Sequence, residues 1–583
     1  MLLALVAGWV GTRAWLAKGE LEAAVPLAST IQSEVGSGKV DEARATADEL
    51  RRHAQSAASL TDDPIWRSVE LLPWAGSNLT AFREAAAVTN DVASNAVWPL
   101  VSNVAQLGVG SFQPVNGTID LAALASAEAS VTSAASALDR AAVDVNAIDT
   151  SATIVPVTQA VGQLQATVQR VDDLMAGVSK AVTLIPRMLG AEGPRNYLLL
   201  FQNPAELRAG GGITSALALV STQDGSVRLA SQASSSSFPV FPSPVLALPD
   251  ETRGLYTDRV SRYVQNTTLT PDFDLSGQIA STMWTDRFGG SVDGVISFDP
   301  VALSYLLKAT GPVVLPSGDK LTAENAVKFL LSDVYTLYPE PVVQDAVFAS
   351  AAKAVFDRVA GGDIDPKTLI DALVQSGQEG RFKIWSSHSD DQALLAGTTL
   401  AGGIPGNAGD STGIGVYFND ATGAKMDYYL TTAVDAQSEV CRADGRPAIR
   451  VRVTLTNTAP ADAATSLPAY VTGGGGFGIA PGNIKTLVYV YGPHSSGEMN
   501  DATIVTSVDP GIPGGTYRAA LDQGYLVAEV PVELAPGETR TVTVDYLAQP
   551  GDSLLLNAQI TPTINPTVYS TEINTGFSGC PIR

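Results

Sequence analysis

The stretch from Asn196 to Ser221, NYLLLFQNPAELRAGGGITSALALVS, places a polar, glycine-rich loop between two apolar runs. Residues 197–201 are continuously apolar and residues 213–220 are mostly apolar, as expected of strands that are buried on both faces. The loop between them contains Gln202, Asn203, Glu206, Arg208, Gly210, Gly211 and Gly212. Polar side chains at the end of a buried strand, followed by glycines that let a ligand approach the backbone, are how α/β proteins form sites. We therefore predict a ligand site in this loop.

The composition describes a folded, acidic protein. With 583 residues the chain has room for roughly three to four domains. Its 45% hydrophobic and 16% charged residues are typical of folded proteins. The net charge of −23 argues against a nucleic-acid partner, because a phosphate backbone needs a basic surface. The histidines, His53, His388 and His494, show no metal-ligand spacing, which argues against a histidine metal site.

Residues 1–17 form an apolar segment that we predict to be a membrane anchor. Residues 2–10 are apolar, but the run is shorter than the roughly 20 residues that a spanning helix needs. An anchor with a truncated, positively charged start and a secretory signal peptide are competing interpretations. We favour the anchor because a basic n-region and a clear cleavage site are absent. An ordinary amphipathic helix is a third interpretation, because Arg13 interrupts the apolar pattern. The anchor would place the rest of the chain outside the cytoplasm.

Residues 18–185 read as a helical stalk rich in alanine, serine and valine. Candidate helices cover residues 39–60, 78–107, 121–148 and 153–182. Small apolar residues recur on one face, which predicts close packing in an antiparallel bundle. Since no catalytic constellation occurs here, we expect a spacer or a bundle that binds partners.

Residues 186–425 alternate between strand and helix patterns. Further strands are predicted at residues 227–231, 292–298, 382–385 and 415–418. Helices are predicted at residues 270–284, 301–309, 326–338, 342–359 and 366–375. This alternation predicts an α/β sheet covered by helices. Asp274, in the segment that opens the helix ending at residue 284, and Asp299, before the helix at 301–309, are candidate N-caps, and a turn role is expected for Asp293.

Three groups of residues carry a family resemblance: 196–212, the Pro271-Asp272-Phe273 segment, and 292–300 with Gly311-Pro312-Val313. They resemble a bacterial membrane family known as domain of unknown function four thousand and twelve. More remotely, the pattern is similar to the LytR-CpsA-Psr family. That family consists of membrane-anchored extracytoplasmic α/β enzymes, which move glycan polymers from a polyprenyl-pyrophosphate carrier to the cell wall. They use Mg²⁺ and a cluster of arginines and aspartates.

The resemblance implies particular roles for the loop. Asn203 lies near the enzyme family's aspartate position and Arg208 near its first arginine, with residues 210–214 replacing the rest of the motif. The second motif of that family, Pro-Arg-Asp, is missing between residues 227 and 249. A pyrophosphate needs several positive groups or a metal to offset its charge, so a single loop arginine argues against transfer chemistry.

The candidate site residues follow from these patterns. Catalytic roles are assigned to Arg208 and Asp272, and Mg²⁺ ligation to Asp272 and Asp274, because hard cations take carboxylate oxygens. The candidate ligand-binding residues are Gln202, Asn203, Glu206, Gly211 and Thr214. The competing interpretations are structural. Glu206 and Arg208 would then form a local ion pair, and the two aspartates would cap a helix.

Residues 426–583 read as an all-β domain. Residues 448–456 alternate between apolar and polar side chains. Similar strands are predicted at residues 485–491, 503–508, 525–532, 539–546 and 554–560, separated by turn signals. This spacing predicts an immunoglobulin-like sandwich. In an oxidising compartment Cys441 and Cys580 would pair, and closing so long a loop contributes about 4–5 kcal/mol. Two free thiols are the alternative.

The sequence thus predicts a multidomain protein: an N-terminal α-helical bundle, a central α/β domain similar to the LytR-CpsA-Psr fold, and a C-terminal immunoglobulin-like sandwich. The favoured function is a non-catalytic, membrane-anchored cell-envelope protein that binds ligand or acts as a scaffold in glycan assembly. The alternative is a phosphotransferase that moves glycan from a polyprenyl-pyrophosphate carrier. Expected partners are envelope glycan or polyprenyl-linked lipid, the membrane and other proteins. Mg²⁺ is the one cofactor considered.

Overall fold

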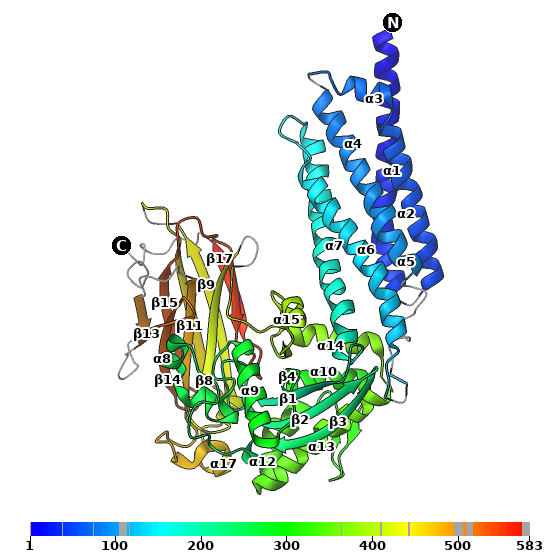
Figure 1. Cartoon of the computed structure of the whole chain (residues 1–583). Helices are drawn as coiled ribbons and strands as arrows, with labels where there is room; N and C mark the ends of the chain where they lie inside the picture. The colour runs from blue at the N-terminus through cyan, green and yellow to red at the C-terminus, as the bar shows by residue number, and fades with distance from the viewer. Residues whose placement is uncertain are drawn as a thin grey trace. The chain divides into compact units, whose positions relative to one another are not determined.

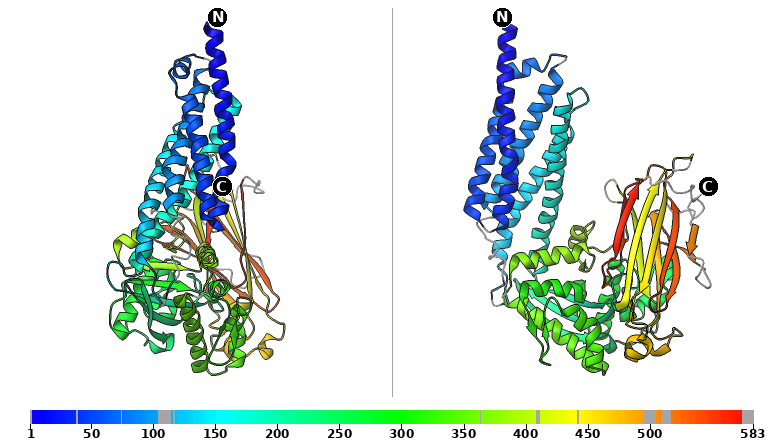
Figure 2. Two further views of the ribbon diagram at one scale, coloured as in Figure 1. Left: turned by 90° about the vertical axis from the view of Figure 1, so that its right-hand side faces the viewer. Right: turned by 180° about the vertical axis from the view of Figure 1, so that it is seen from behind.

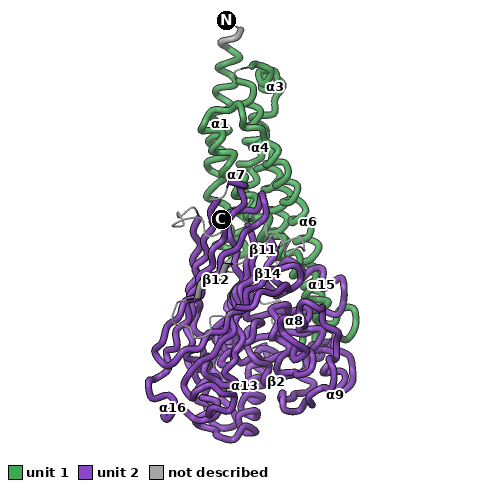
Figure 3. The backbone as a smooth tube through the Cα atoms, turned by 90° about the vertical axis from the view of Figure 1, so that its left-hand side faces the viewer, with its two compact units in different colours: residues 1–194, 223–226 green, residues 195–222, 227–583 purple. Residues whose placement is uncertain are grey.

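The structure is a computed structural model that forms two compact units. It describes residues 2–37, 39–73, 75–103, 114–115, 117–362, 364–407, 411–440, 443–494, 505–508 and 517–573. The first unit comprises Met1–Pro194 with Gln223–Ser226, and the second comprises Arg195–Thr222 with Val227–Arg583 (Figure 3). The helical and strand-rich parts of the chain are therefore separate, as the sequence predicts.

The first unit is a bundle of long helices that lie side by side (Figures 1 and 2). Its elements are α1 (Leu2–Gly36), α2 (Val40–Thr61), α3 (Pro64–Val69), α4 (Gly76–Asp91), a π-helical turn (Val92–Val97), α5 (Trp98–Asn103), α6 (Leu121–Asn146) and α7 (Val155–Met188). The four predicted stalk helices are all present. Alanine dominates the packed faces, as in α6, where Ala127, Ala134 and Ala141 are almost fully buried. Such small side chains let neighbouring helices approach closely.

The predicted anchor is the first part of a longer helix. α1 continues through residue 17 without a break, so the predicted boundary at this point falls inside the helix. Val10, Ala17, Ala24 and Ile31 are buried along one face at a spacing of seven residues. Arg13, which interrupts the apolar run, forms an ion pair of 3.0 Å with Asp63 and donates to the Leu60 carbonyl oxygen at 2.7 Å.

One helix in the described part of the chain is long and apolar enough to cross a membrane. This helix is α6, with a mean hydropathy of 1.3, and 39% of its apolar window is buried within the protein. The buried helix of a soluble bundle has the same composition, so a membrane span is compatible with α6 without being required by it.

In the second unit a five-stranded mixed sheet occupies the α/β region, residues 195–407. Its strand order is β3 (Ser226–Ser234), β2 (Ile213–Gln223), β1 (Arg195–Asn203), β4 (Gly294–Phe298) and β7 (Lys383–Ser386). β1 is antiparallel to β2 and parallel to β4, whereas β7 is antiparallel to β4. Leu198 and Leu200 of β1 are completely buried, which confirms the predicted central strand.

Helices lie around this sheet (Figure 1). The longer helices are α9 (Phe273–Phe288), α10 (Pro300–Thr310), α13 (Pro341–Gly361) and α14 (Pro366–Gln378). The shorter helical elements are α8 (Asp250–Tyr256), α11 (Ala326–Lys328), a π-helical turn (Phe329–Asp333), α12 (Val334–Leu337) and α15 (Ser389–Leu395). The region also contains a small hairpin, β5 (Val313–Val314) and β6 (Lys320–Leu321). The strand and helix alternation predicted for this region is thus present.

The β-rich region, residues 411–573, contains two five-stranded sheets. One has the order β12 (Val505–Val508), β15 (Thr539–Leu547), β10 (Ala448–Asn457), β9 (Leu430–Glu439) and β17 (Val568–Ile573). The other has the order β13 (Arg518–Asp522), β14 (Tyr525–Leu534), β11 (Ile484–His494), β8 (Thr412–Asp420) and β16 (Leu556–Ile560). Most pairs are antiparallel, but β16 is parallel to β8 and β17 is parallel to β9, so both sheets are mixed.

The two sheets share a hydrophobic core. Val451 and Val453 of β10 and Val488 of β11 are fully buried in one continuous cluster. The strand predicted at residues 415–418 was expected in the α/β sheet, but as part of β8 it pairs with β11 and β16. An apolar run predicts that a strand is buried without identifying its partner. The predicted Cys441–Cys580 disulfide lies outside the described residues.

Candidate functional site

The 204–212 loop that joins β1 to β2 is buried and internally hydrogen-bonded. The Asn203 side-chain oxygen accepts from the Ala205 amide at 3.0 Å, and Asn203 Nδ2 donates to the Tyr335 hydroxyl at 2.5 Å. The Ile213 amide donates to the Glu206 carbonyl oxygen at 2.9 Å. These bonds fold the loop back on itself at the end of β1, where the sequence predicted an accessible site.

The Arg208 guanidinium is bound by other groups of the protein. It forms an ion pair with Glu206 at 3.0 Å and donates to Asn266 Oδ1 at 3.3 Å and to the Leu207 carbonyl oxygen at 2.9 Å. Only 7% of Arg208 is exposed. The second oxygen of Glu206 accepts from Lys425, which follows β8. Two cations thus share one buried carboxylate.

The pKa values of this cluster follow from burial and charge. Burial alone would raise the pKa of Glu206, but the cations Lys425 and Arg208 outweigh it and lower that pKa. Burial would lower the pKa of Lys425, yet the Glu206 carboxylate raises it. The charged forms of Glu206 and Lys425 are therefore favoured at neutral pH.

A segment of the β-rich region holds the loop from its other side. The Leu207 amide donates to Asp427 Oδ2 at 2.7 Å, and the Asp427 amide donates to the Ala205 carbonyl oxygen at 3.1 Å. The Asp420 amide similarly donates to the Leu207 carbonyl oxygen at 2.9 Å. Burial and the neighbouring Asp420 raise the pKa of Asp427 well above its usual range, so its neutral form is favoured. The loop is therefore a hydrogen-bonded joint between the α/β sheet and the β-rich region.

The remaining loop candidates are packed against each other. Gln202 is buried, and its Oε1 lies 2.2 Å from the position that a Cβ on residue 211 would occupy. Gly211 also has a φ of +135°, so glycine is required there. Thr214 Oγ1 lies 3.4 Å from Thr267 Oγ1, inside the protein. The structure thus brings the predicted ligand residues together, but as interior contacts.

Asp272 and Asp274 lie at the start of α9, and Asp272 is its N-cap. Asp272 Oδ1 accepts from the Asp274 amide at 3.0 Å, and its Oδ2 accepts from Gln523 at 2.7 Å. Capping was the structural interpretation of both aspartates; Asp272 confirms it, whereas Asp274 accepts from Gln278 at 3.1 Å. Burial, and then the neighbouring Asp272, raise the pKa of Asp274. Among the described residues, no three or more acidic, histidine or cysteine side chains gather into a metal-binding group.

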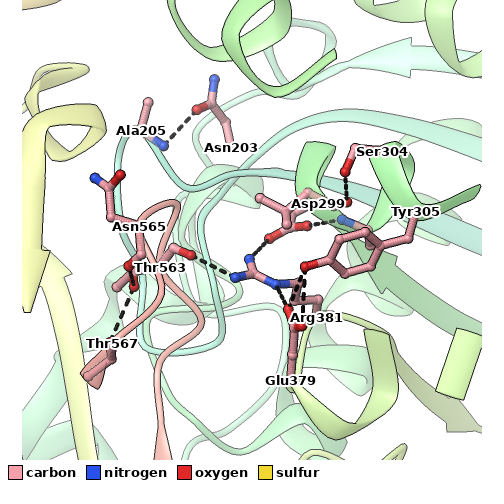
Figure 4. A network of polar contacts seen from close by, with 12 residues as sticks. Asn203, Ala205, Asp299, Ser304, Tyr305, Glu379, Arg381, Thr563, Asn565 and Thr567 are labelled. Atoms are coloured by element: carbon pink, nitrogen blue, oxygen red, sulfur yellow. Dashed lines mark hydrogen bonds and ion pairs between the residues drawn. The ribbon is translucent and has the colours of Figure 1, made fainter. Parts of the chain in front are cut away.

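Sequence reasoning missed a buried arginine, Arg381, that joins three segments (Figure 4). Its guanidinium contacts Asp299 at 2.7 Å, Glu379 at 2.5 Å and the Thr563 carbonyl oxygen at 2.8 Å. Asp299 also accepts from the Ala302 amide at 2.8 Å, which confirms its predicted role as the N-cap of α10. The available sequence signal was the pair of basic residues, Arg381 and Lys383, next to a short apolar run. Basic side chains at a buried strand must be paired with other groups of the protein.

A second basic residue, two positions after Arg381, borders a pocket. Lys383 of β7 is buried, and its Nζ donates to the Gly210 carbonyl oxygen at 2.6 Å. The pocket has a volume of about 250 Å³ and lies between the α/β and β-rich regions of the second unit. A smaller cavity of about 40 Å³ at the ends of β1 and β4 is lined mainly by apolar side chains, among them Phe201, Phe298 and Phe348.

A histidine pairs with one of the predicted turn residues. His388 Nε2 lies 2.9 Å from Asp293 Oδ1, while Asp293 Oδ2 accepts from the Asn196 amide at 2.7 Å. Asp293 therefore links the start of β1 to the segment before α15. Because these residues are distant in sequence, spacing did not predict the pair.

The comparison with known families identifies part of the second unit. Residues 192–335 match the model of a family described as "Protein of unknown function (DUF4012)". No curated protein matches the chain. The matched segment contains the 204–212 loop and Asp272, whereas Arg381, Lys383 and Lys425 lie beyond it. Over residues 192–335 the chain therefore carries the domain of this family, as its sequence motifs predicted.

Proposed function

We propose that this protein is a non-catalytic component of the cell envelope that binds a ligand or holds partner proteins during glycan assembly. In this proposal an apolar helix attaches the chain to the membrane, and the bulk lies outside the cytoplasm. The remote similarity of the α/β region to the LytR-CpsA-Psr family supports the connection with envelope glycan. The family matched at residues 192–335 is itself described as of unknown function.

The main support for a non-catalytic role is that Arg208 is already paired with other groups of the protein. A transferase acting on a polyprenyl-pyrophosphate must present several cations or a metal to the pyrophosphate. Arg208 is the candidate cation of the loop, and it is already bound to Glu206, Asn266 and the Leu207 carbonyl oxygen. Withdrawing it would leave Glu206 with Lys425 alone in a buried site. Breaking a buried ion pair costs roughly 3–5 kcal/mol, so a ligand would have to replace that energy.

The second observation concerns the surroundings of the loop. Both Asp420 and Asp427 lie against it, and a pyrophosphate entering the joint would approach these acids as well as Glu206. Glu206, whose pKa is lowered, would repel the pyrophosphate, whereas burial raises the pKa of Asp420 and Asp427 and favours their neutral forms. The joint is therefore suited to fixing two parts of one unit, and a ligand-binding or scaffolding role would use other surfaces.

Native mass spectrometry of the full chain with a polyprenyl-pyrophosphate lipid, with and without Mg²⁺, tests this proposal. Arg208→Ala is compared with Arg253→Ala, because Arg253 forms an exposed ion pair with Asp250 and lies outside the joint. We expect any lipid binding to be independent of Mg²⁺. Mg²⁺-dependent binding that only Arg208→Ala abolishes, in a variant that keeps its circular dichroism spectrum, would establish the phosphotransferase alternative instead.

A further inference from the structure

The pocket beside Lys383 contains a buried cation, the Lys383 ammonium, which forms no ion pair with a carboxylate in the described part of the chain. Only 7% of Lys383 is exposed, and its Nζ has one acceptor among the described residues, the Gly210 carbonyl oxygen. An ammonium group has three N–H donors, so two of them remain for the pocket. Groups buried at this depth are normally fully hydrogen-bonded, and exceptions concentrate at binding sites.

The neighbouring charges are already used elsewhere. The charged residues around Lys383 are Asp299, Arg381 and Glu379, and they bind one another: Arg381 contacts both acids, at 2.7 Å and 2.5 Å. Burial lowers the pKa of Lys383 to about 8, against a smaller opposing effect of Asp299. The ammonium form is still the main one at neutral pH, and it is the group in this pocket that lacks a counter-charge.

The backbone at Gly402 passes close to the aliphatic part of the Lys383 side chain. A Cβ on residue 402 would lie 2.4 Å from Lys383 Cδ, and Gly402 has a φ of +59°. The adjacent Gly403 has open space at the same position. Glycine at residue 402 therefore lets the chain pass close over the side chain, whose ammonium donates to the Gly210 carbonyl oxygen.

The rim of the pocket is polar. Gln378, Thr399, Asn557 and Gln559 line it and are exposed, whereas Lys383 and Tyr417 line it and are buried. The Tyr417 hydroxyl donates to Gln559 Oε1 at 3.3 Å, which orients that amide. Amide and hydroxyl groups around a wet opening can donate to and accept from a polyol, and they suit an apolar ligand poorly.

We propose that this pocket binds an anionic monosaccharide, a sugar carboxylate or a sugar phosphate, with its anionic group on Lys383 Nζ and its hydroxyls on the amide and hydroxyl rim. The volume of about 250 Å³ matches about eight waters at ~30 Å³ each, which is the size class of a single sugar ring. The chain carries a net charge of −23, so a local buried cation is needed to attract an anion. The proposal requires neither the membrane nor a ligand on Arg208 and stands independently of the proposed function.

Isothermal titration calorimetry of the full chain tests the assignment with glucuronate, glucose 6-phosphate and neutral glucose. A ligand of about 12 non-hydrogen atoms at ordinary binding efficiency gives a Kd of about 1 mM. We expect at least one of the two anions, glucuronate or glucose 6-phosphate, to bind in this range, and we expect glucose to bind more weakly. Which anion binds more tightly distinguishes a phosphate site from a carboxylate site, and either result supports the proposal.

Lys383→Met is the diagnostic variant and Lys320→Met is its control, because Lys320 is an exposed residue of β6. Loss of a charge-assisted hydrogen bond should weaken anion binding about tenfold or more in Lys383→Met alone. Glucuronate binding should also weaken between pH 7 and pH 9, as Lys383 loses its proton near its pKa of about 8. Equal binding of glucose and glucuronate, or binding that Lys383→Met leaves unchanged, would overturn the proposal.

Acetylation of the wild-type protein gives a measurement that does not depend on the variant folding. The fraction of Lys383 acetylated by acetic anhydride at pH 8 is measured by peptide mass spectrometry with and without the anionic sugars. We expect protection of Lys383 and unchanged labelling of Lys320. If neither anion protects Lys383 and neither binds in calorimetry, the pocket is not a sugar site.

Discussion

Arg208 and Lys383 both contact the 204–212 loop, but they are buried in opposite ways. Arg208 meets the Glu206 carboxylate and two further oxygen acceptors, so its charge is used in holding the loop. Lys383 meets one carbonyl oxygen and faces a pocket. The difference shows that a buried cation indicates a binding site when it has no carboxylate partner. The positive charge of the side chain by itself does not distinguish the two cases.

Glu206→Gln should have the largest effect, because it leaves both Arg208 and Lys425 buried without their carboxylate. We expect the free energy of unfolding to fall by about 3–5 kcal/mol, as when one partner of a buried ion pair is removed. Urea denaturation measures the change. Glu340→Gln is the control, since Glu340 is exposed before α13, and it should stay within about 0.5 kcal/mol of the wild type. A small loss in Glu206→Gln would mean that the joint does not depend on its charges.

Gly402→Ala tests the close passage of the backbone over Lys383. The added Cβ would meet Lys383 Cδ at 2.4 Å and occupy a left-handed backbone conformation, so we expect a loss of about 1–3 kcal/mol. Gly403→Ala is the matched control because nothing lies within 4 Å of its Cβ position. Thermal unfolding of the two variants compares them directly. Equal melting temperatures would show that the lysine stem is not confined at residue 402.

Asp427→Asn tests the acidic side of the joint through its pH dependence. Below about pH 4 both the folded and the unfolded protein hold the Asp427 proton. As the pH rises, the unfolded chain releases it first, because the pKa of Asp427 is raised in the folded state. The wild type should therefore lose stability relative to Asp427→Asn by up to about 1.4 kcal/mol per pH unit, until the folded pKa is reached.

Urea denaturation of Asp427→Asn and the wild type at several pH values from 4 to 8 gives this difference. Asp286→Asn, at an exposed position near the end of α9, serves as the control and should show a constant offset. A difference between Asp427→Asn and wild type that stays constant with pH would contradict a raised pKa at residue 427.

Lys383→Met should have the smallest effect on stability. The variant loses one hydrogen bond to the Gly210 carbonyl oxygen but also removes a buried charge without a counter-acid. These terms oppose each other, so we expect a change within about 1 kcal/mol. Set beside Glu206→Gln, this result would separate a cation that holds the fold from one that is available to a ligand. If the free energy of unfolding measured by urea denaturation fell by several kcal/mol, Lys383 would hold the fold together as Arg208 does.

The sequence predicted the local elements of the protein well. The helices at residues 121–146 and 155–188 and the strands at residues 195–203 and 213–223 lie where their apolar patterns indicated. Asp299 caps α10 as expected, because a cap is set by the residues that directly follow it. Periodicity and capping are local properties, so a single sequence contains them.

The tertiary structure decided which of these elements meet. The strand predicted at residues 415–418 pairs with β11 and β16, and of the two aspartates considered as caps of α9, Asp272 is the one that caps it. The pairing of strands depends on the packing of their faces, which an apolar run by itself does not specify.

The character of the site also depended on the tertiary structure. Glu206 and its partner Lys425 are 219 positions apart, and Lys383 is 173 positions from Gly210. From the sequence alone, Arg208 is a cation after a strand with an acid two residues away, and both a free and a paired guanidinium fit this pattern. Because burial and counter-charge are set by the folded chain, only the structure distinguishes the paired Arg208 from the pocket-facing Lys383.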